Sequence, residues 1–145
     1  MPTSPGSRHR RIRSDHATEL AEDYVEAIAE IIDQQGVCRG TDLAERFAVS
    51  HVTVNRTIGR LERDGYVKAE PYAPVELTAK GRRLASESSA RHEIVLRFLV
   101  ALGVPQASAA IDSEGIEHHC SEDTLRCMRK FIEQKGSVQN NSSPS

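Results

Sequence analysis

Six acidic and imidazole side chains in this 145-residue chain have types and spacings that suit a hard divalent metal ion. They are Asp23, Glu26, His92, Glu114, Glu117 and His118. Spacings of three and four residues place the first two on one face of an expected helix and the last three on one face of another. Four converging carboxylates would repel one another, whereas two divalent ions would cancel their charge and two neutral imidazoles would complete the ligand shell. The set therefore predicts a site for two ions.

Some of these residues also have an ordinary explanation when each is taken alone. Asp23 and Glu26 near a helix start are more typical of helix-dipole stabilisation and solubility, and a lone His92 is more typical of a surface or partner-bound imidazole. The run 114–119 favours metal binding, because acids and imidazole on one face beside a small glycine are a poor choice for solubility alone. Carboxylate and imidazole donors without thiolate suit manganese or ferrous iron better than copper or structural zinc.

The first half of the chain predicts three helices that would position these ligands. Apolar residues recur at helical spacing, and the expected helices span 17–35, 41–47 and 50–64. Thr41 and Ser50 can cap the second and third helices with their hydroxyl groups, and Gly65 can end the third at a left-handed position. A short helix, a tight turn and a longer helix are the order of a helix-turn-helix.

Two short extended stretches follow, over 66–70 and 75–78. They are joined through Pro71 and Pro74, which is typical of a small β-hairpin wing. These residues therefore extend the helix-turn-helix into a winged helix-turn-helix, which is a DNA-binding module.

The second half of the chain predicts three further helices. The first is long and spans 78–102, the second begins at Pro105 and carries Glu117 and His118, and the third runs over 121–132. The fold class is therefore mainly α with a small β-hairpin wing. The expected domains are a disordered basic arm (1–16), the winged helix-turn-helix (17–80), a helical metal-binding domain (81–136) and a disordered tail (137–145).

One face of the helix over 50–64 has the side chains that read DNA. Val54, Ile58 and Leu61 form an apolar stripe for burial, so the opposite face can enter a major groove as a rigid unit. Asparagine can pair with adenine, arginine with guanine or phosphate, and hydroxyls or histidine with base edges or backbone. The alternative is an amphipathic surface helix whose polar side faces only water. The candidate DNA contacts are Ser50, His51, Thr53, Asn55, Arg56 and Arg60.

Charge gives only local support for nucleic-acid binding. The chain has 19 basic and 21 acidic side chains and a net charge of −2, so no overall basic excess indicates nucleic acid. Arginines crowd the amino terminus, where they either reach a minor groove or phosphates or form a solvated tail. These arginines are Arg8, Arg10, Arg11 and Arg13.

Cysteine usage bears on the compartment of the protein. Cys38, Cys120 and Cys127 occur without C-x-x-C spacing, which argues against a disulfide framework and a zinc knuckle. We expect Cys120 and Cys127 to be buried thiols. A reducing cytoplasm fits this usage, and no apolar run is long enough to span a bilayer. We therefore expect a cytoplasmic protein with no membrane partner.

The order of these motifs resembles a known family. A winged helix-turn-helix, then Arg-His-Glu over 91–93, then Glu-Gly-Ile-Glu-His-His over 114–119, is similar to the manganese transport regulator (MntR) branch of the DtxR family of metal-dependent repressors. The likeness covers roughly residues 17–136. It implies a two-ion manganese site whose ligands come from the first helix, the long helix and the dimerisation helix, matching Asp23, Glu26, His92, Glu114, Glu117 and His118.

The same resemblance bears on the choice of metal. The iron-responsive branch carries methionine at the position of Asp23 and cysteine at the position of Glu114, and both are softer donors. The two carboxylates here therefore favour Mn²⁺, with two ions per protomer, and leave Fe²⁺ as the alternative cofactor.

The resemblance also implies how such a protein acts. The helical second domain would form a homodimer, and a two-fold dimer recognises double-stranded operator DNA with inverted half-sites. Metal would tie the DNA-reading domain to the dimerisation domain and lock the operator-binding conformation. The implied function is manganese-dependent repression of manganese uptake genes.

Three other functions are open to the sequence. The first is an iron-responsive repressor of the same family, which differs from the manganese-dependent repressor only in its metal ion. The second is a metal-independent winged-helix regulator, in which the acids would be surface residues of the helices with no role as ligands. A di-metal carboxylate enzyme is disfavoured, because the acids are not in paired Glu-x-x-His repeats and no separate nucleophile or general base stands out.

Overall fold

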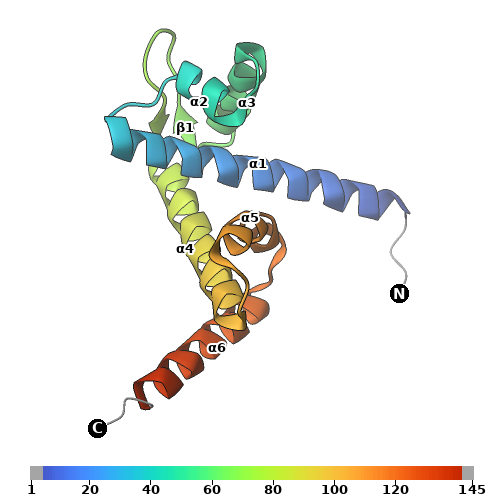
Figure 1. The fold of residues 1–145 in the computed structure, drawn as a ribbon. Coiled ribbons are helices and arrows are strands. Elements are labelled where there is room, and N and C mark those ends of the chain that lie inside the picture. The colour runs from blue at the N-terminus through green and yellow to red at the C-terminus, as the bar shows by residue number, and fades with distance from the viewer. Residues whose placement is uncertain (1–4, 142–145) are drawn as a thin grey trace. The chain divides into compact units, whose positions relative to one another are not determined.

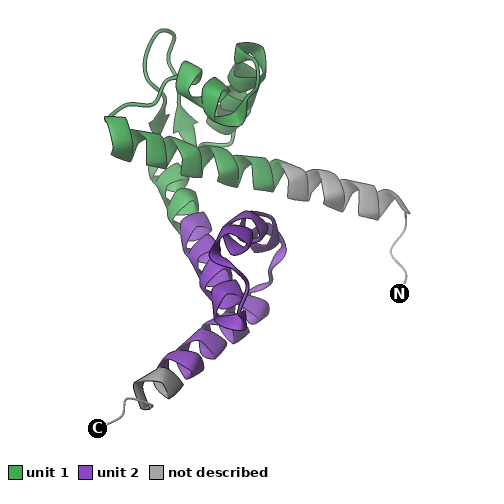
Figure 2. Cartoon of the chain, viewed as in Figure 1, with its two compact units in different colours: residues 1–86 green, residues 87–145 purple. Residues whose placement is uncertain are grey.

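The computed structural model describes residues 17–136 in full and the backbone of two helix ends beyond them. The chain divides into two compact units, residues 1–86 and residues 87–145 (Figure 2). The expected arm and tail, 1–16 and 137–145, lie outside the fully described residues and stay predictions. Among the residues searched, no helix is long and apolar enough to cross a membrane.

Unit 1 is a winged helix-turn-helix. Its core joins α1, α2, α3 and the wing through buried Tyr24, Ile28, Leu43 and Leu61, and the Tyr24 ring stacks on Phe47 with centroids 4.4 Å apart. Its elements are α1 (Pro5–Gln35), α2 (Gly40–Phe47), α3 (His51–Arg63), β1 (Val67–Lys68), β2 (Glu76–Leu77) and the first turns of α4 (Ala79–Leu102) (Figure 1).

Three of the predicted helix boundaries follow from local hydrogen bonding. Ser50 caps α3, since its hydroxyl accepts a 3.2 Å bond from the Thr53 amide. Gly65 follows the end of α3 with a φ of +84°, which a residue with a side chain rarely adopts. Thr78 caps α4, because its hydroxyl accepts a 3.1 Å bond from the Gly81 amide. These three boundary predictions are confirmed.

The predicted cap of α2 is wrong. The helix begins at Gly40, one residue before Thr41, and the Arg39 amide donates to Asp42 Oδ2 at 2.8 Å. This backbone hydrogen bond holds the pKa of Asp42 below its usual value. A carboxylate reaching back from the first turn therefore takes the place of the expected hydroxyl cap.

The wing is fixed to α3. Its two short strands pair antiparallel, with Val67 opposite Leu77. They are shorter than the predicted stretches, because the Ala69 amide donates to Glu62 and the Val75 amide donates to the Cys38 carbonyl, so neither amide extends the ladder. Just beyond β1, the Ala69 amide donates to Glu62 Oε2 of α3 at 2.8 Å. The base of the wing and the helix expected to read DNA therefore form one rigid body.

Cys38 lies at the centre of unit 1. Its side chain is fully buried, and the desolvation, followed by the nearby charge of Asp42, raises the pKa of the thiol from 9.0 to about 11. The thiol therefore stays protonated at neutral pH and behaves as a small apolar side chain.

Unit 2 is helical. Its core is buried Val95, Leu125 and Met128, with Phe98 and Phe131 packed edge to face at a centroid distance of 5.3 Å. Ser121 caps the last helix as predicted, accepting a 3.2 Å bond from the Thr124 amide. The elements are the remainder of α4, α5 (Gln106–Ile116), a 3₁₀ turn η1 (Glu117–His119) and α6 (Glu122–Asn141).

Two predictions for unit 2 are wrong. The α-helix expected to carry Glu117 and His118 ends at Ile116, and both residues lie on the 3₁₀ turn that follows it. Cys127, expected to be buried, is exposed on α6, whereas Cys120 is partly buried. Helical spacing alone does not say which side of α6 meets the core.

Gly81 gives a sharp test of the winged-helix packing. A Cβ at Gly81 would lie 2.1 Å from the carbonyl oxygen of Tyr66, so the backbones must separate if alanine is introduced. We predict that Gly81→Ala lowers the free energy of unfolding by about 1–3 kcal/mol in urea titrations.

Gly59→Ala is the matched control, because a Cβ at that α3 position meets no other atom within 4 Å. It should stabilise unit 1 by about 0.5–1 kcal/mol by favouring the helix. Equal effects of the two alanines would contradict the close approach of α4 to the wing.

Candidate metal centre and nucleic-acid interface

Three predicted metal ligands gather in unit 2 around the carboxylate of Glu117. His92 reaches it from α4, with Nδ1 3.1 Å from Oε2, and His118 reaches it from η1, with Nε2 3.6 Å from Oε1. The side chains of Glu117 and His118 are only 3% and 4% exposed. Each carboxylate oxygen therefore faces one imidazole nitrogen in a buried setting.

This arrangement has the chemistry of a metal-binding group. Ligand atoms at right angles around an ion, each at about 2.1 Å, lie roughly 3 Å apart, which is close to the His92–Glu117 separation. A buried carboxylate also costs free energy unless positive charge compensates it, and a divalent cation supplies more charge than a proton. The residues present thus fit a hard divalent ion.

The nearby thiol is a poor competitor for that ion. Cys120 follows η1, and its burial, and then the negative charge of Glu117, raise the pKa of the thiol above its usual value. A protonated thiol does not act as a ligand, since metals bind the thiolate. The donors that face one another around Glu117 are oxygen and nitrogen atoms.

Glu114 is the predicted unit 2 ligand that stands apart from this group. It is exposed on α5, whereas Glu117 is buried on the 3₁₀ turn. The prediction that Glu114, Glu117 and His118 share one α-helical face does not describe the structure, because the helix ends between the first and the second of them.

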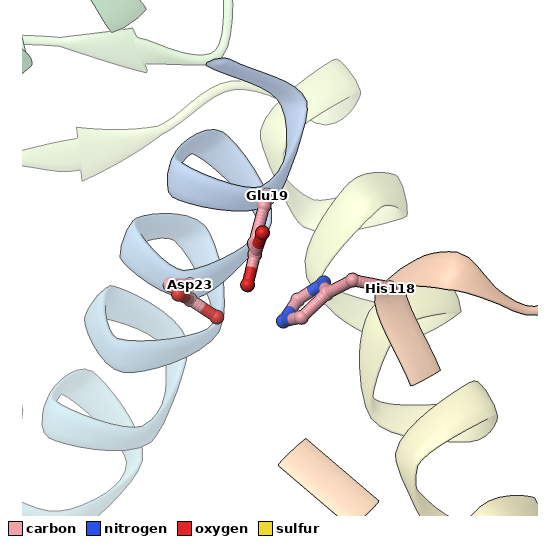
Figure 3. A group of neighbouring side chains, drawn as sticks. All are labelled: Glu19, Asp23 and His118. Atoms are coloured by element: carbon pink, nitrogen blue, oxygen red, sulfur yellow. The ribbon is translucent and has the colours of Figure 1, made fainter. Parts of the chain in front are cut away.

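The remaining predicted ligands lie on α1 in unit 1. Asp23 and Glu26 are both half-buried, on the side of the helix away from its apolar stripe. Glu19 lies one turn before Asp23, and a carboxylate oxygen of each lies within 4.8 Å of the other (Figure 3). The His118 ring drawn in the same figure belongs to unit 2.

Sequence reasoning missed two acids of this α1 face. Glu19 and Glu22 precede the predicted pair and share its helical spacing, and Glu22 is buried to 6% exposure. The spacing i, i+3, i+4 and i+7 over 19–26 was the signal that could have found them. Four acids on one face repel one another, so a cation near this face would stabilise it.

The predicted DNA-reading face of α3 is open to solvent. Val54, Ile58 and Leu61 are buried as expected, with Thr57 beside them. All six predicted contacts, Ser50, His51, Thr53, Asn55, Arg56 and Arg60, are exposed. The face can therefore meet a groove without any rearrangement of the core.

Two details of this face were not predicted. The Ser50 and Thr53 hydroxyls lie 3.0 Å apart and bond to each other. Val52 is 66% exposed in the middle of the outer face, where an apolar side chain suits a thymine methyl group. The sequence feature that could have identified Val52 is an apolar residue that lies off the buried stripe of this helix.

Two family descriptions match most of the chain. The iron dependent repressor N-terminal DNA binding domain matches residues 16–75. The iron dependent repressor metal binding and dimerisation domain matches residues 78–137. The chain belongs to the iron dependent repressor family. The predicted fold class and family resemblance are thereby confirmed. The predicted ligands His92, Glu117 and His118 lie within the residues that match the metal binding and dimerisation domain.

Relatives in this repressor family are transcriptional regulators. The chain is 44% identical to the transcriptional regulator MntR of Escherichia coli O157:H7 over 127 residues, which are 88% of this chain and 82% of that protein. It is 36% identical to the HTH-type transcriptional regulator MntR of Bacillus velezensis over 108 residues, 74% of this chain and 76% of that protein. The chain is thus a regulator and not an enzyme.

Solved structures of regulators share the fold. A manganese-dependent transcriptional repressor in complex with manganese has a TM-score of 0.67 and 31% identity, covering 80% of this chain and 52% of that one. The manganese regulator SloR has a TM-score of 0.68 and 26% identity, covering 78% of this chain and 53% of that one. The chain therefore spans about half the length of these two proteins.

The group around Glu117 predicts a metal response that one substitution removes. MnCl₂ should raise the unfolding temperature of the wild-type protein, since a ligand that binds only the folded state stabilises it. We predict that Glu117→Gln weakens Mn²⁺ binding at least about tenfold in calorimetry and abolishes most of this thermal shift.

Glu93→Gln is the matched control, because Glu93 is exposed and adjacent to His92 on α4. It removes the same charge without touching the carboxylate between the imidazoles. An equal loss of Mn²⁺ affinity in both variants would mean that general acidity, and not this group, binds the ion.

Proposed function

We propose that the protein is a manganese-responsive transcriptional repressor. The observation that carries the proposal is the buried Glu117 carboxylate facing His92 and His118 within a domain of the metal binding and dimerisation type. The names of the relatives add that MntR proteins and a manganese-dependent repressor have this fold. Manganese prefers oxygen-rich donors with imidazole, which are the donor types present.

The proposed site takes two Mn²⁺ ions per protomer. Its ligands are Asp23, Glu26, His92, Glu114, Glu117 and His118. Four carboxylates carry the charge that two divalent ions neutralise, and the imidazoles bind as neutral donors. Fe²⁺ is the second candidate ion, since it accepts the same oxygen and nitrogen donors.

Metal would act through the position of the DNA-reading unit. The ligands come from both units, so their capture by an ion restricts how the two can move. An ion can shift this equilibrium only by its higher affinity for the DNA-competent arrangement, with couplings of about 1–3 kcal/mol being typical. Operator DNA should in turn tighten the binding of Mn²⁺. The proposed output is repression of manganese uptake genes.

The proposed assembly is a homodimer on two-fold DNA. Unit 2 exposes large apolar side chains that a partner would cover: Val100, Leu102, Ile111 and Ile116. Exposed apolar side chains of this number mark an interface in a small unit. A dimer with one α3 per protomer matches an operator with inverted half-sites.

Metal dependence of DNA binding tests the proposal directly. A duplex selected by the wild-type protein from a randomised pool, in MnCl₂, would be titrated by fluorescence anisotropy with metal and with chelator. We predict that metal tightens binding about 5- to 150-fold and that Asp23→Asn removes most of this gain.

Asp33→Asn is the control, because Asp33 is exposed on α1 about two turns beyond Glu26. It should respond to manganese as the wild type does. Equal wild-type affinity with metal and with chelator would rule out the proposed metal response, and activation by Fe²⁺ alone would favour the iron alternative.

The dimer has its own test. Ile111 is 73% exposed on α5, so a charge there disturbs no core but would be buried unpaired in an interface. We predict that Ile111→Glu weakens self-association at least about tenfold in sedimentation experiments. Val37→Glu, at a 44% exposed position of unit 1, should leave it unchanged. Loss of the dimer in both variants would contradict an interface on unit 2.

A further inference from the structure

Tyr72, at the tip of the wing, has a side chain that no interaction within the fold explains. It is fully exposed, at 103% of its reference area. The neighbouring chain forms a turn in which the Ala73 amide donates to the Glu70 carbonyl at 3.2 Å. Tyr72 is the third residue of that turn and has a φ of +65°. The chain thus displays an aromatic ring where glycine or asparagine would be less strained.

The strain at Tyr72 differs from that at Ala48, the other residue with a side chain and a positive φ among the described residues. Ala48 ends α2, and its amide bonds carbonyls of that helix, so its conformation belongs to a helix cap. Tyr72 caps no element. A costly backbone conformation that presents a ring to solvent indicates a role in binding.

The position of the ring is fixed relative to the reading helix. Val67 and Val75 at the base of the wing are buried, and the Ala69 amide is bonded to Glu62 of α3. Pro71 precedes Tyr72 in the turn and restricts the backbone further. These contacts hold the base of the wing beside α3, so a duplex that lies against α3 also lies near the wing tip.

The charge around the tip decides which kind of contact is possible. Lys68 and Glu70 are both exposed on the strand side of the turn, so the tip has no excess of positive charge. A neutral phenol can still donate a hydrogen bond to a phosphate oxygen, and its ring can pack on a sugar. Such a contact positions a protein on DNA without reading sequence.

We propose that Tyr72 is a positioning residue for DNA binding, in which the wing tip contacts the sugar–phosphate backbone beside the groove occupied by α3. The phenol hydroxyl donates to a phosphate and the ring covers a deoxyribose. The inference rests on the DNA binding of unit 1 and not on the identity of the metal.

The test is fluorescence anisotropy at several salt concentrations, using the selected duplex in saturating MnCl₂. Tyr72→Ala and Tyr72→Gly should weaken binding at least about fivefold, and Tyr72→Phe should lose less, because it keeps the ring. The slope of log affinity against log salt should stay at the wild-type value, since no charge is removed. Arg56→Ala is the contrasting control, because loss of a phosphate-binding charge reduces that slope by about 1.

Two further measurements separate this role from a structural one. Tyr72→Gly removes the strain, so its unfolding midpoint should equal or exceed that of the wild type. Phosphate ethylation interference should lose one or two positions in Tyr72→Ala and keep the others. Mn²⁺ affinity without DNA should be unchanged.

Unchanged DNA affinity in both truncations, a reduced salt slope, or an unaltered ethylation pattern would each overturn the proposal. Failure of the proposed metal response would give a different result in the anisotropy titration from failure of the Tyr72 proposal. In that case the wild type binds the duplex equally with metal and with chelator, and the comparison between Tyr72 variants can still be made.

Discussion

A buried carboxylate between two imidazoles is the constraint on which the behaviour of unit 2 depends. Glu117 is almost inaccessible to water, and the imidazoles of His92 and His118 lie beside its carboxylate oxygens. Its partners are histidines, which are neutral or positive according to pH and which bind metals when neutral. A cation that binds such a group in the folded state stabilises the protein by an amount that grows with the logarithm of the cation concentration. The protein therefore has a reason in its own electrostatics to respond to ion concentration.

The DNA-reading unit has a different character, because backbone contacts and apolar packing hold its parts together. The bond from Ala69 to Glu62 joins the wing to α3, and Gly81 allows the start of α4 to pack directly on the backbone of Tyr66. The core beneath α3 is apolar, with Val54, Ile58 and Leu61 buried. In the proposed mechanism, a metal ion would shift which arrangements of this unit are populated.

Sequence patterns predicted the features that depend on local chemistry. The cap at Ser50 could be foreseen because serine is favoured beside a helix start, although the same rule failed at Thr41, where Asp42 accepts the Arg39 amide. The end of α5 could not, since the 3₁₀ turn at Glu117 has the same residue types as a helix and is set by packing. The exposed side of α6 was missed for a related reason. Spacing defines a face but not what covers it.

The three thiols differ in their environments, and this has a practical consequence. Cys38 is sealed in unit 1 with a pKa of about 11, Cys120 is partly buried with a raised pKa, and Cys127 alone is exposed. Maleimide dyes and spin labels react with accessible thiolates. The native chain thus has a single addressable anchor for a spectroscopic reporter on α6, so distances between protomers could be followed without engineering the cysteines.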